Sequence, residues 1–280
     1  MTICVIAKVN ECVVFVADSA SSLTAVDSNG QATISRVYNH ADKVFNLFRG
    51  LPICAMTCGL GNFGKESIAT ITKSIRRDLM SGATAISREN YTIKDVIGHC
   101  YTVFESKFDA LDPELRDQTT FDFFVGGFSH NNGGNELWKF SFSLGTKLAP
   151  ECLSDVDGWG IFWAGQPEAC VRLVLGISSV THRVMTEVGL TEAQASQLVQ
   201  SIRQASEVSL IEPSMPVIDA IRLAEFLGQT TASFVKFLPG ADTVGGDLDI
   251  ATVTKYEGFK WIKRKHFYPR ELNGENDHVS

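Results

Sequence analysis

The chain has 280 residues, of which 44% are hydrophobic and 20% charged, and its formal net charge is -7 at pH 7. These values are typical of a globular protein with a sizeable core, and the negative charge argues against a general binder of nucleic acid. No run approaches the roughly 18 apolar residues of a membrane span, the start lacks a basic secretory leader, and the odd number of cysteines, 7, fits reduced thiols. We therefore expect a cytoplasmic protein that binds neither a membrane nor nucleic acid.

The start of the chain predicts two β-strands joined by a tight turn. Two apolar runs rich in β-branched residues flank the polar pair Asn10-Glu11. Antiparallel pairing across this turn places Ile3 opposite Asp18, so a carboxylate is expected beside Thr2. Because successive positions in both runs are apolar, we expect the sheet to be covered on both faces.

Thr2 becomes the N-terminal residue if Met1 is removed, as is usual for a methionine that precedes a small residue. A free α-amine has a pKa of about 7.7 to 8.0, so part of it is uncharged near neutral pH and can accept the hydroxyl proton. An N-terminal threonine can therefore act as a nucleophile that carries its own base. Met-Thr begins many proteins, so this pair alone predicts no enzyme.

The remaining patterns predict strands and helices in alternating groups. A polar, serine-rich connection, long enough to be a functional loop, runs to about residue 39. Helices that come in pairs between groups of antiparallel strands favour an α+β layered fold over a doubly wound parallel sheet. The expected order is a second hairpin (43–48 and 52–58), helices (65–80 and 92–110), strands (121–129, 136–143 and 159–165), helices (167–188, 192–208 and 216–237) and strands (247–254 and 258–263).

Residues 59–65 satisfy the G-x-G-x-x-G pattern of dinucleotide-binding loops, after a strand and before a helix. Asp78, at the expected distance for the ribose, falls inside the helix, and Glu66 stands where a P-loop has Ser or Thr. We expect no nucleotide cofactor. The glycines instead favour a tight turn with exposed backbone amides, which could serve as an oxyanion hole.

Two other groupings predict no ligand site. Cysteine and histidine spacing indicates no metal site, and Cys54 and Cys58 are interpreted as core residues. The basic cluster at 263–266 is interpreted as a solvated strand end or a subunit contact, because the chain as a whole is acidic.

Several short motifs occur in the order found in one enzyme family. They are Thr2-Ile3-Cys4-Val5, Val14-Phe15-Val16-Ala17-Asp18-Ser19, Asp42-Lys43-Val44-Phe45, Thr57-Cys58-Gly59, and later Thr243-Val244-Gly245-Gly246-Asp247-Leu248-Asp249-Ile250 with Glu257-Gly258-Phe259. With these motifs the chain resembles the proteasome β-subunits, which are N-terminal-nucleophile threonine peptidases, and their bacterial relatives, the heat-shock-locus protease and the ancestral β-subunit group. The match covers residues 2–128 and 215–263.

The resemblance implies a four-layer αββα sandwich of the N-terminal-nucleophile hydrolase type. We expect this fold to form a single domain over residues 1–270, with a helical insertion at about 166–214, followed by a polar tail at 271–280. The likeness further implies a self-compartmentalising ring of identical subunits that cleaves peptides or unfolded proteins, with an ATP-dependent unfoldase as partner. It implies no cofactor and no metal.

The same resemblance assigns roles to four residues. Thr2 attacks an amide carbonyl, and the Gly59 N–H stabilises the oxyanion. Lys43, held by Asp18, favours the deprotonated form of the threonine hydroxyl.

The match is imperfect before the late glycine pair. The family has Asp-x-x-Ser-Gly there, whereas Asp242 lies one residue too near the glycine and Val244 occupies the serine position, so Thr243 would have to supply the hydroxyl. Three functions stay open: a threonine endopeptidase, a proteasome-like structural subunit without activity, and a small-molecule amidohydrolase of the same class. The missing serine favours the second, and the helical insertion favours the third.

Overall fold

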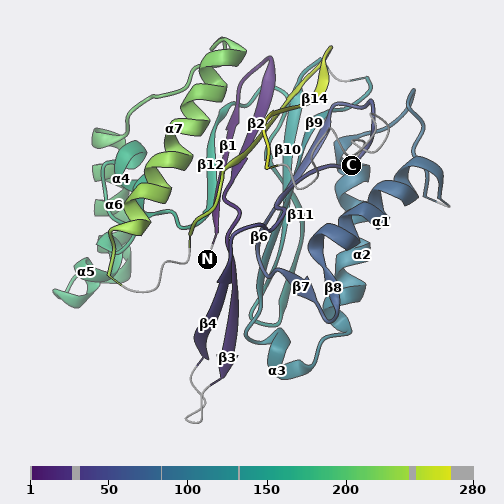
Figure 1. The fold of residues 1–280 in the computed structure, drawn as a ribbon. Helices are drawn as coiled ribbons and strands as arrows, with labels where there is room; N and C mark the ends of the chain where they lie inside the picture. The colour runs from purple at the N-terminus through teal and green to yellow at the C-terminus, as the bar shows by residue number, and fades with distance from the viewer. Residues whose placement is uncertain (1, 27–31, 83, 132, 240–243, 266–280) are drawn as a thin grey trace.

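The computed structural model describes residues 2–26, 32–82, 84–131, 133–239 and 244–265. These residues form antiparallel sheets and seven helices, which confirms a mixed α and β fold (Figure 1). In chain order the elements are β1 (Ile3–Lys8), β2 (Cys12–Ala17), β3 (Ser21–Val26), β4 (Ala32–Tyr38), β5 (Val44–Asn46), β6 (Ile53–Gly59), β7 (Asn62–Phe63), β8 (Glu66–Ser67), α1 (Ile68–Ser81), α2 (Ile93–Asp109), α3 (Pro113–Arg116), β9 (Thr120–Phe128), β10 (Asn135–Ser143), β11 (Thr146–Ser154), β12 (Gly160–Gly165), α4 (Glu168–Leu175), α5 (Thr181–Glu187), α6 (Glu192–Ser206), α7 (Val217–Lys236), β13 (Asp249–Thr254) and β14 (Gly258–Lys263).

The first five-stranded sheet has the order β12-β1-β2-β13-β14. Its β1 and β2 form the predicted hairpin in the predicted register, with Cys4 opposite Ala17. The N–H of Ile3 donates a 2.8 Å hydrogen bond to Oδ1 of Asp18, so the carboxylate lies where the pairing predicted it. Every residue of both strands is buried, which confirms that the sheet is covered on both faces.

The second five-stranded sheet has the order β11-β10-β9-β6-β5. The predicted hairpin of β5 and β6 is present, with Val44 opposite Met56. The sequence does not predict β11, because most residues of this edge strand are exposed and lack an apolar period, and Pro150 interrupts it.

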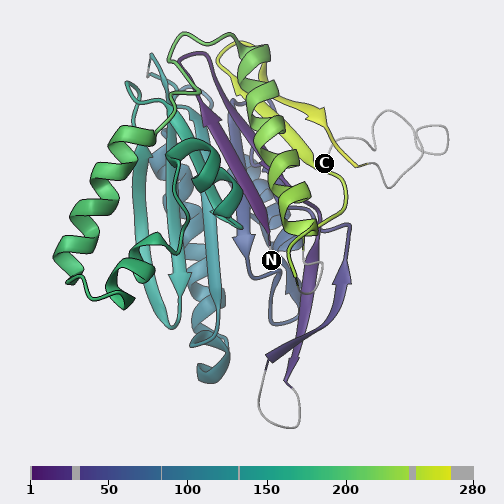
Figure 2. The same ribbon diagram turned by 90° about the vertical axis from the view of Figure 1, so that its left-hand side faces the viewer.

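The two sheets pack against each other through one shared apolar cluster. Phe15 of β2 lies in this cluster with Met56 of β6 and Phe124 of β9. Cys54 and Cys58 belong to the same cluster, as expected for core cysteines. Figure 2 shows the strands of the two sheets side by side in projection, and residue contacts join β1 and β2 to β6.

Helices α1 and α2 cover the other face of the second sheet (Figure 1). Thr92 caps α2 by accepting a hydrogen bond from the Asp95 N–H at 3.0 Å, in agreement with the predicted start. Phe104 of α2 packs against Phe123 of β9 with 4.9 Å between ring centroids. The aromatic cluster beneath these helices consists of Phe63, Phe104, Phe108, Phe121, Phe123, Phe140 and Phe142.

Helix α7 covers the outer face of the first sheet, where it contacts β1 and β2. Gly228 lets the helix approach closely, because a Cβ atom there would lie 2.8 Å from Cγ1 of Val16.

The predicted helix at 167–188 is instead two helices, since Gly176 adopts a φ of 68° and ends α4. The predicted α6 is confirmed with its capping box at Thr191 and Gln194.

The serine-rich connection after β2 forms a two-stranded antiparallel sheet, β3 and β4, rather than a loop.

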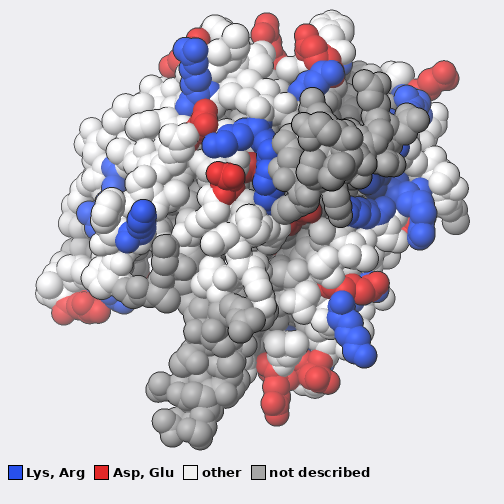
Figure 3. Space-filling view, viewed as in Figure 1, with Lys and Arg blue, Asp and Glu red and all other residues white. Residues whose placement is uncertain are grey.

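The structure also corrects the interpretation of the basic cluster at one position: Lys265 is buried, with 9% of its surface exposed. Acidic and basic side chains are interspersed over the described atoms of the face in Figure 3. Within the described residues, no helix combines the length and apolarity needed to span a bilayer.

Candidate active site

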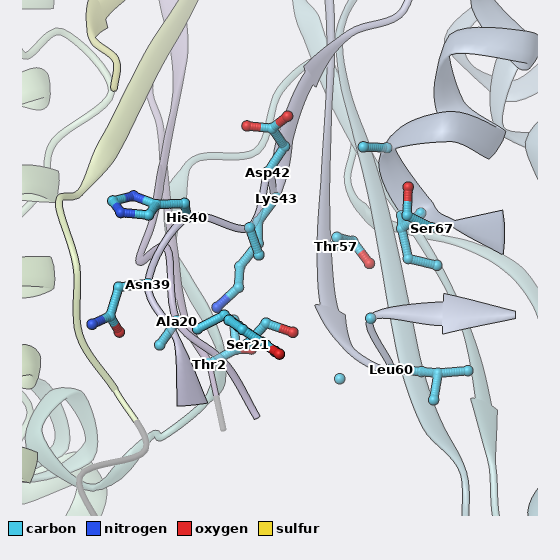
Figure 4. A pocket seen from close by; sticks show the side chains of 16 residues that line it. Thr2, Ala20, Ser21, Asn39, His40, Asp42, Lys43, Thr57, Leu60 and Ser67 are labelled. Carbon is cyan, nitrogen blue, oxygen red and sulfur yellow. The ribbon is translucent and has the colours of Figure 1, made fainter. Parts of the chain in front are cut away.

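A pocket of about 460 Å³ opens where the start of β1 meets the end of β6 and the start of α1 (Figure 4). Thr2, Lys43 and Gly59 line it together, although they come from three different strand ends. The structure thus gathers three of the residues that the sequence singles out. The fourth, Asp18, lies directly beneath them.

Asp18 is buried, with 1% of its surface exposed, and accepts hydrogen bonds on both carboxylate oxygens. Lys43 Nζ lies 2.6 Å from Oδ1, which also accepts from the N–H of Ile3. The N–H of Ala20 donates to Oδ2 at 3.1 Å, and that of Gly245 lies 3.5 Å away. These donors hold the carboxylate in one orientation, so its charge can compensate the buried ammonium group of Lys43.

Lys43 enters the pocket from the segment that precedes β5. Its carbonyl oxygen accepts a 2.9 Å hydrogen bond from the N–H of Thr57, which continues the pairing between β5 and β6. Figure 4 shows its side chain extending toward Thr2, and only 6% of the residue is exposed. A cation therefore stands between Asp18 and the pocket.

The backbone of Thr2 is fixed by the neighbouring strand β12. Its carbonyl oxygen accepts a 2.9 Å hydrogen bond from the N–H of Gln166. Gly165 has a φ of 86°, and a Cβ atom at this position would overlap the carbonyl oxygen of Thr2. The sequence did not predict this contact, and the one local signal for it is the glycine at the last position of β12.

Gly59 ends β6 in a conformation that other residues rarely adopt, with a φ of 99°. A Cβ atom at this position would overlap the carbonyl oxygen of Thr120 in the neighbouring strand. Amides two residues apart in a strand project from the same edge, so the N–H of Gly59 points to the side on which Thr57 bonds to Lys43. This places a backbone donor at the pocket, as an oxyanion site requires.

The thiol of Cys4 lies behind the pocket and is a poor candidate nucleophile. Burial raises its pKa well above the usual value, and the neighbouring Cys58 raises it further. The thiol donates to the carbonyl oxygen of Thr57 at 3.3 Å. Cys4 is therefore protonated at neutral pH, which leaves the hydroxyl of Thr2 as the better candidate.

The rest of the lining is polar on one side and partly apolar on the other. The polar side includes Ser21, Asn39, His40 and Asp42, and the apolar contribution comes from Leu60, Ile68 and Ala69. Such a mixed surface can hold both a polar backbone and an apolar substituent of a ligand.

Asp242 and Thr243, the candidate supporting residues, lie outside the described residues. Among the residues that are described, no group of three or more His, Cys, Asp and Glu side chains could hold a metal ion.

Neither the protein-family models nor the curated proteins gave a match to this chain.

Proposed function

We propose that the protein is an amide hydrolase whose nucleophile is Thr2 once Met1 has been removed. The observation that carries this proposal is the buried pair of Lys43 and Asp18, which holds an ammonium group at the pocket that Thr2 and Gly59 also line. A positive charge at this place favours the alkoxide form of a nearby hydroxyl.

The packing supports assignment to the N-terminal-nucleophile hydrolase type. Clusters of apolar residues join α7 to the first sheet, the first sheet to the second, and the second sheet to α1 and α2. We interpret this order as the four-layer αββα sandwich that the motifs imply, with α4, α5 and α6 as the inserted helices between β12 and α7.

In the proposed reaction the amine of Thr2 takes the proton of its own hydroxyl, and Oγ1 forms a bond to the amide carbonyl carbon. The carbonyl oxygen becomes an oxyanion, which accepts the N–H of Gly59. The C–N bond then breaks, and the leaving amine receives the proton held by the Thr2 ammonium. The amine of Thr2 then takes a proton from a water molecule, whose oxygen forms a bond to the acyl carbon of the ester. The bond between this carbon and Oγ1 breaks, the product leaves as a carboxylic acid, and Oγ1 regains its proton from the Thr2 ammonium.

We propose an endopeptidase acting on peptides or unfolded proteins within a ring of identical subunits, together with an ATP-dependent unfoldase in the cytoplasm. The order of the motifs around Thr2, Asp18, Lys43 and Gly59 supports this choice among hydrolases. A pocket of about 460 Å³ is large enough for a side chain and adjoining backbone of a peptide.

The test is intact-protein mass spectrometry before and after incubation with a peptide epoxyketone, with Thr2→Ala as control. We expect a chain that lacks Met1 and gains one adduct, which the variant does not gain. Retained methionine would contradict the proposal, because no free amine would be present at Thr2. A trimmed chain without an adduct would favour the structural subunit, and cleavage of small amides but not of unfolded polypeptide would favour the amidohydrolase.

A further inference from the structure

Lys265 is buried two residues beyond the end of β14, although it belongs to the basic cluster at 263–266, for which the sequence predicts a solvated strand end or a subunit contact. Its Nζ donates to Oγ of Ser19 at 3.0 Å and to the carbonyl oxygen of Ala41 at 2.8 Å. It also forms an ion pair with the carboxylate of Asp249, which is itself buried. A fourth group, Oδ1 of Asp42, lies 3.5 Å away.

These contacts join the segments that carry the two charged residues of the site. Ser19 directly follows Asp18, and Ala41 lies two residues before Lys43. The N–H of Ala41 donates to the carbonyl oxygen of Ser19 at 2.8 Å, so the two segments also bond to each other. Lys265 therefore lies at the junction between the Asp18 strand and the Lys43 segment.

The junction extends to the glycine pair and to β13. The hydroxyl of Ser19 donates to the carbonyl oxygen of Asp247 at 2.6 Å, and its N–H donates to the carbonyl oxygen of Gly245 at 3.2 Å. Asp249 receives the backbone N–H of Lys265 at 3.2 Å as well as its side chain. One ammonium group thus connects the start of β13, the end of β2 and the approach to β5.

We propose that Lys265 is a positioning residue that fixes Asp18 and Lys43 relative to each other beneath Thr2. This inference rests on the proposed function. The described residues that line the pocket do not include Lys265, so its effect would pass through Ser19 and Ala41 and not through contact with a ligand. An ammonium group suits this place because its three N–H donors meet a hydroxyl, a carbonyl oxygen and a carboxylate.

A displacement of about 1 Å in a reacting group can lower a rate by about 100-fold. Loss of the junction would move the charged groups of Lys43 and Asp18 relative to Thr2, while the set of residues that line the pocket stays the same. We therefore expect the chemical step to slow while the binding of a ligand stays nearly unchanged.

The experiment uses the whole chain after removal of Met1 and measures its rate of inactivation at several concentrations of the peptide epoxyketone. The concentration dependence gives the maximal rate of inactivation and the half-saturating concentration separately. The variants are Lys265→Met, and Lys265→Met combined with Asp249→Asn so that no uncompensated carboxylate is buried. Lys263→Met, at an exposed position of the same cluster, is the matched control. Circular dichroism and thermal melting establish that each variant is folded.

We expect the maximal rate to fall by about 10-fold to 100-fold in the combined variant, with a half-saturating concentration within about twofold of the wild type. The control should react as the wild type does. Ser19→Ala keeps the ion pair and supplies a milder variant, for which a loss of several-fold is expected.

Folded variants of Lys265 and Ser19 that react at the wild-type rate would overturn the positioning role alone. A change confined to the half-saturating concentration would also overturn it, since Lys265 would then act on the pocket. A wild-type chain that gains no adduct would overturn the proposed function, and the positioning role with it.

Discussion

Lys43 and Asp18 form an ion pair at 2.6 Å in which the side chains are only 7% and 1% exposed. Burying two charges is unfavourable unless they compensate each other and their remaining hydrogen-bonding groups are satisfied. The N–H groups of Ile3 and Ala20 meet this requirement for the carboxylate. The pair is consequently both a structural element and the electrostatic centre of the proposed site.

Removing one member of this pair should destabilise the fold more than removing both. We expect Lys43→Met and Asp18→Asn each to lower the free energy of unfolding by about 3–5 kcal/mol, because one buried charge is left uncompensated. The double variant should recover part of this loss. All three should fail to react with the epoxyketone, which mass spectrometry would detect.

Urea denaturation measures these changes in stability. The control is Lys139→Met, which removes a partly exposed ion pair with Asp122 and should change the free energy by less than about 1 kcal/mol. Equal losses in the buried and the exposed pair would contradict the role assigned to burial.

Gly59→Ala should abolish the reaction and destabilise the protein. The positive φ disfavours alanine, and its Cβ would overlap the backbone of Thr120, which cannot move without disturbing β9. We expect a loss of more than about 2 kcal/mol in urea denaturation, together with loss of the epoxyketone adduct.

Gly98→Ala, within α2, is the matched control for this substitution. A Cβ atom there meets nothing within 4 Å, so alanine should stabilise the helix by about 0.5–1 kcal/mol and leave the reaction unchanged. A Gly59→Ala protein with wild-type stability would show that the end of β6 is not constrained as described.

The carboxylate of Glu168 should make the stability of the chain depend on acid pH. Burial alone would raise its pKa, but hydrogen bonds from Ser178, Ser179 and Arg172 together lower it to about 2. Because the pKa is lower in the folded state than in the unfolded state, the stabilisation is present above the usual value of about 4.5 and is lost as the pH falls toward 2.

Glu168→Gln should therefore lower the melting temperature at pH 7 and change it little near pH 2. Glu187→Gln, which removes a partner of Arg183 on the exposed surface of α5, should have a small effect at both pH values. If the Glu168→Gln variant has the same melting temperature as the wild type at neutral pH, the proposed stabilisation is excluded.

Alkylation of cysteines should distinguish Cys152 from the other six. Cys152 is exposed on β11, whereas the remaining cysteines are buried. Partial burial and the nearby Glu136 raise the pKa of its thiol, so we expect slow labelling by iodoacetamide at pH 7 and faster labelling as the pH rises. Mass spectrometry should find one label on the native chain and 7 after denaturation.

Cys152→Ser is the control and should remain unlabelled while folded. Rapid labelling of several thiols in the native chain would contradict the packing of the two sheets. This prediction tests the fold without reference to the proposed reaction.

Local patterns were sufficient to predict much of the framework. The hairpin register follows from the short polar turn between apolar strands, and the helix α2 follows from the helical spacing of apolar residues over 92–110. Each signal lies within a few residues of the structure that it predicts. The strand β11 carries no such signal, because an exposed edge strand needs no apolar period.

Some parts of the candidate site could likewise be predicted from the sequence, whereas others could be found only in the structure. Pairing across the first turn placed Asp18 beside Thr2 from the sequence, whereas the contact of Gly165 with Thr2 depends on which strand lies beside β1. The burial of Lys265 also required the tertiary structure, because three separate segments supply its partners. Composition and spacing describe a residue among its neighbours in the chain, but a buried charge is stabilised by groups that only the packed fold brings together.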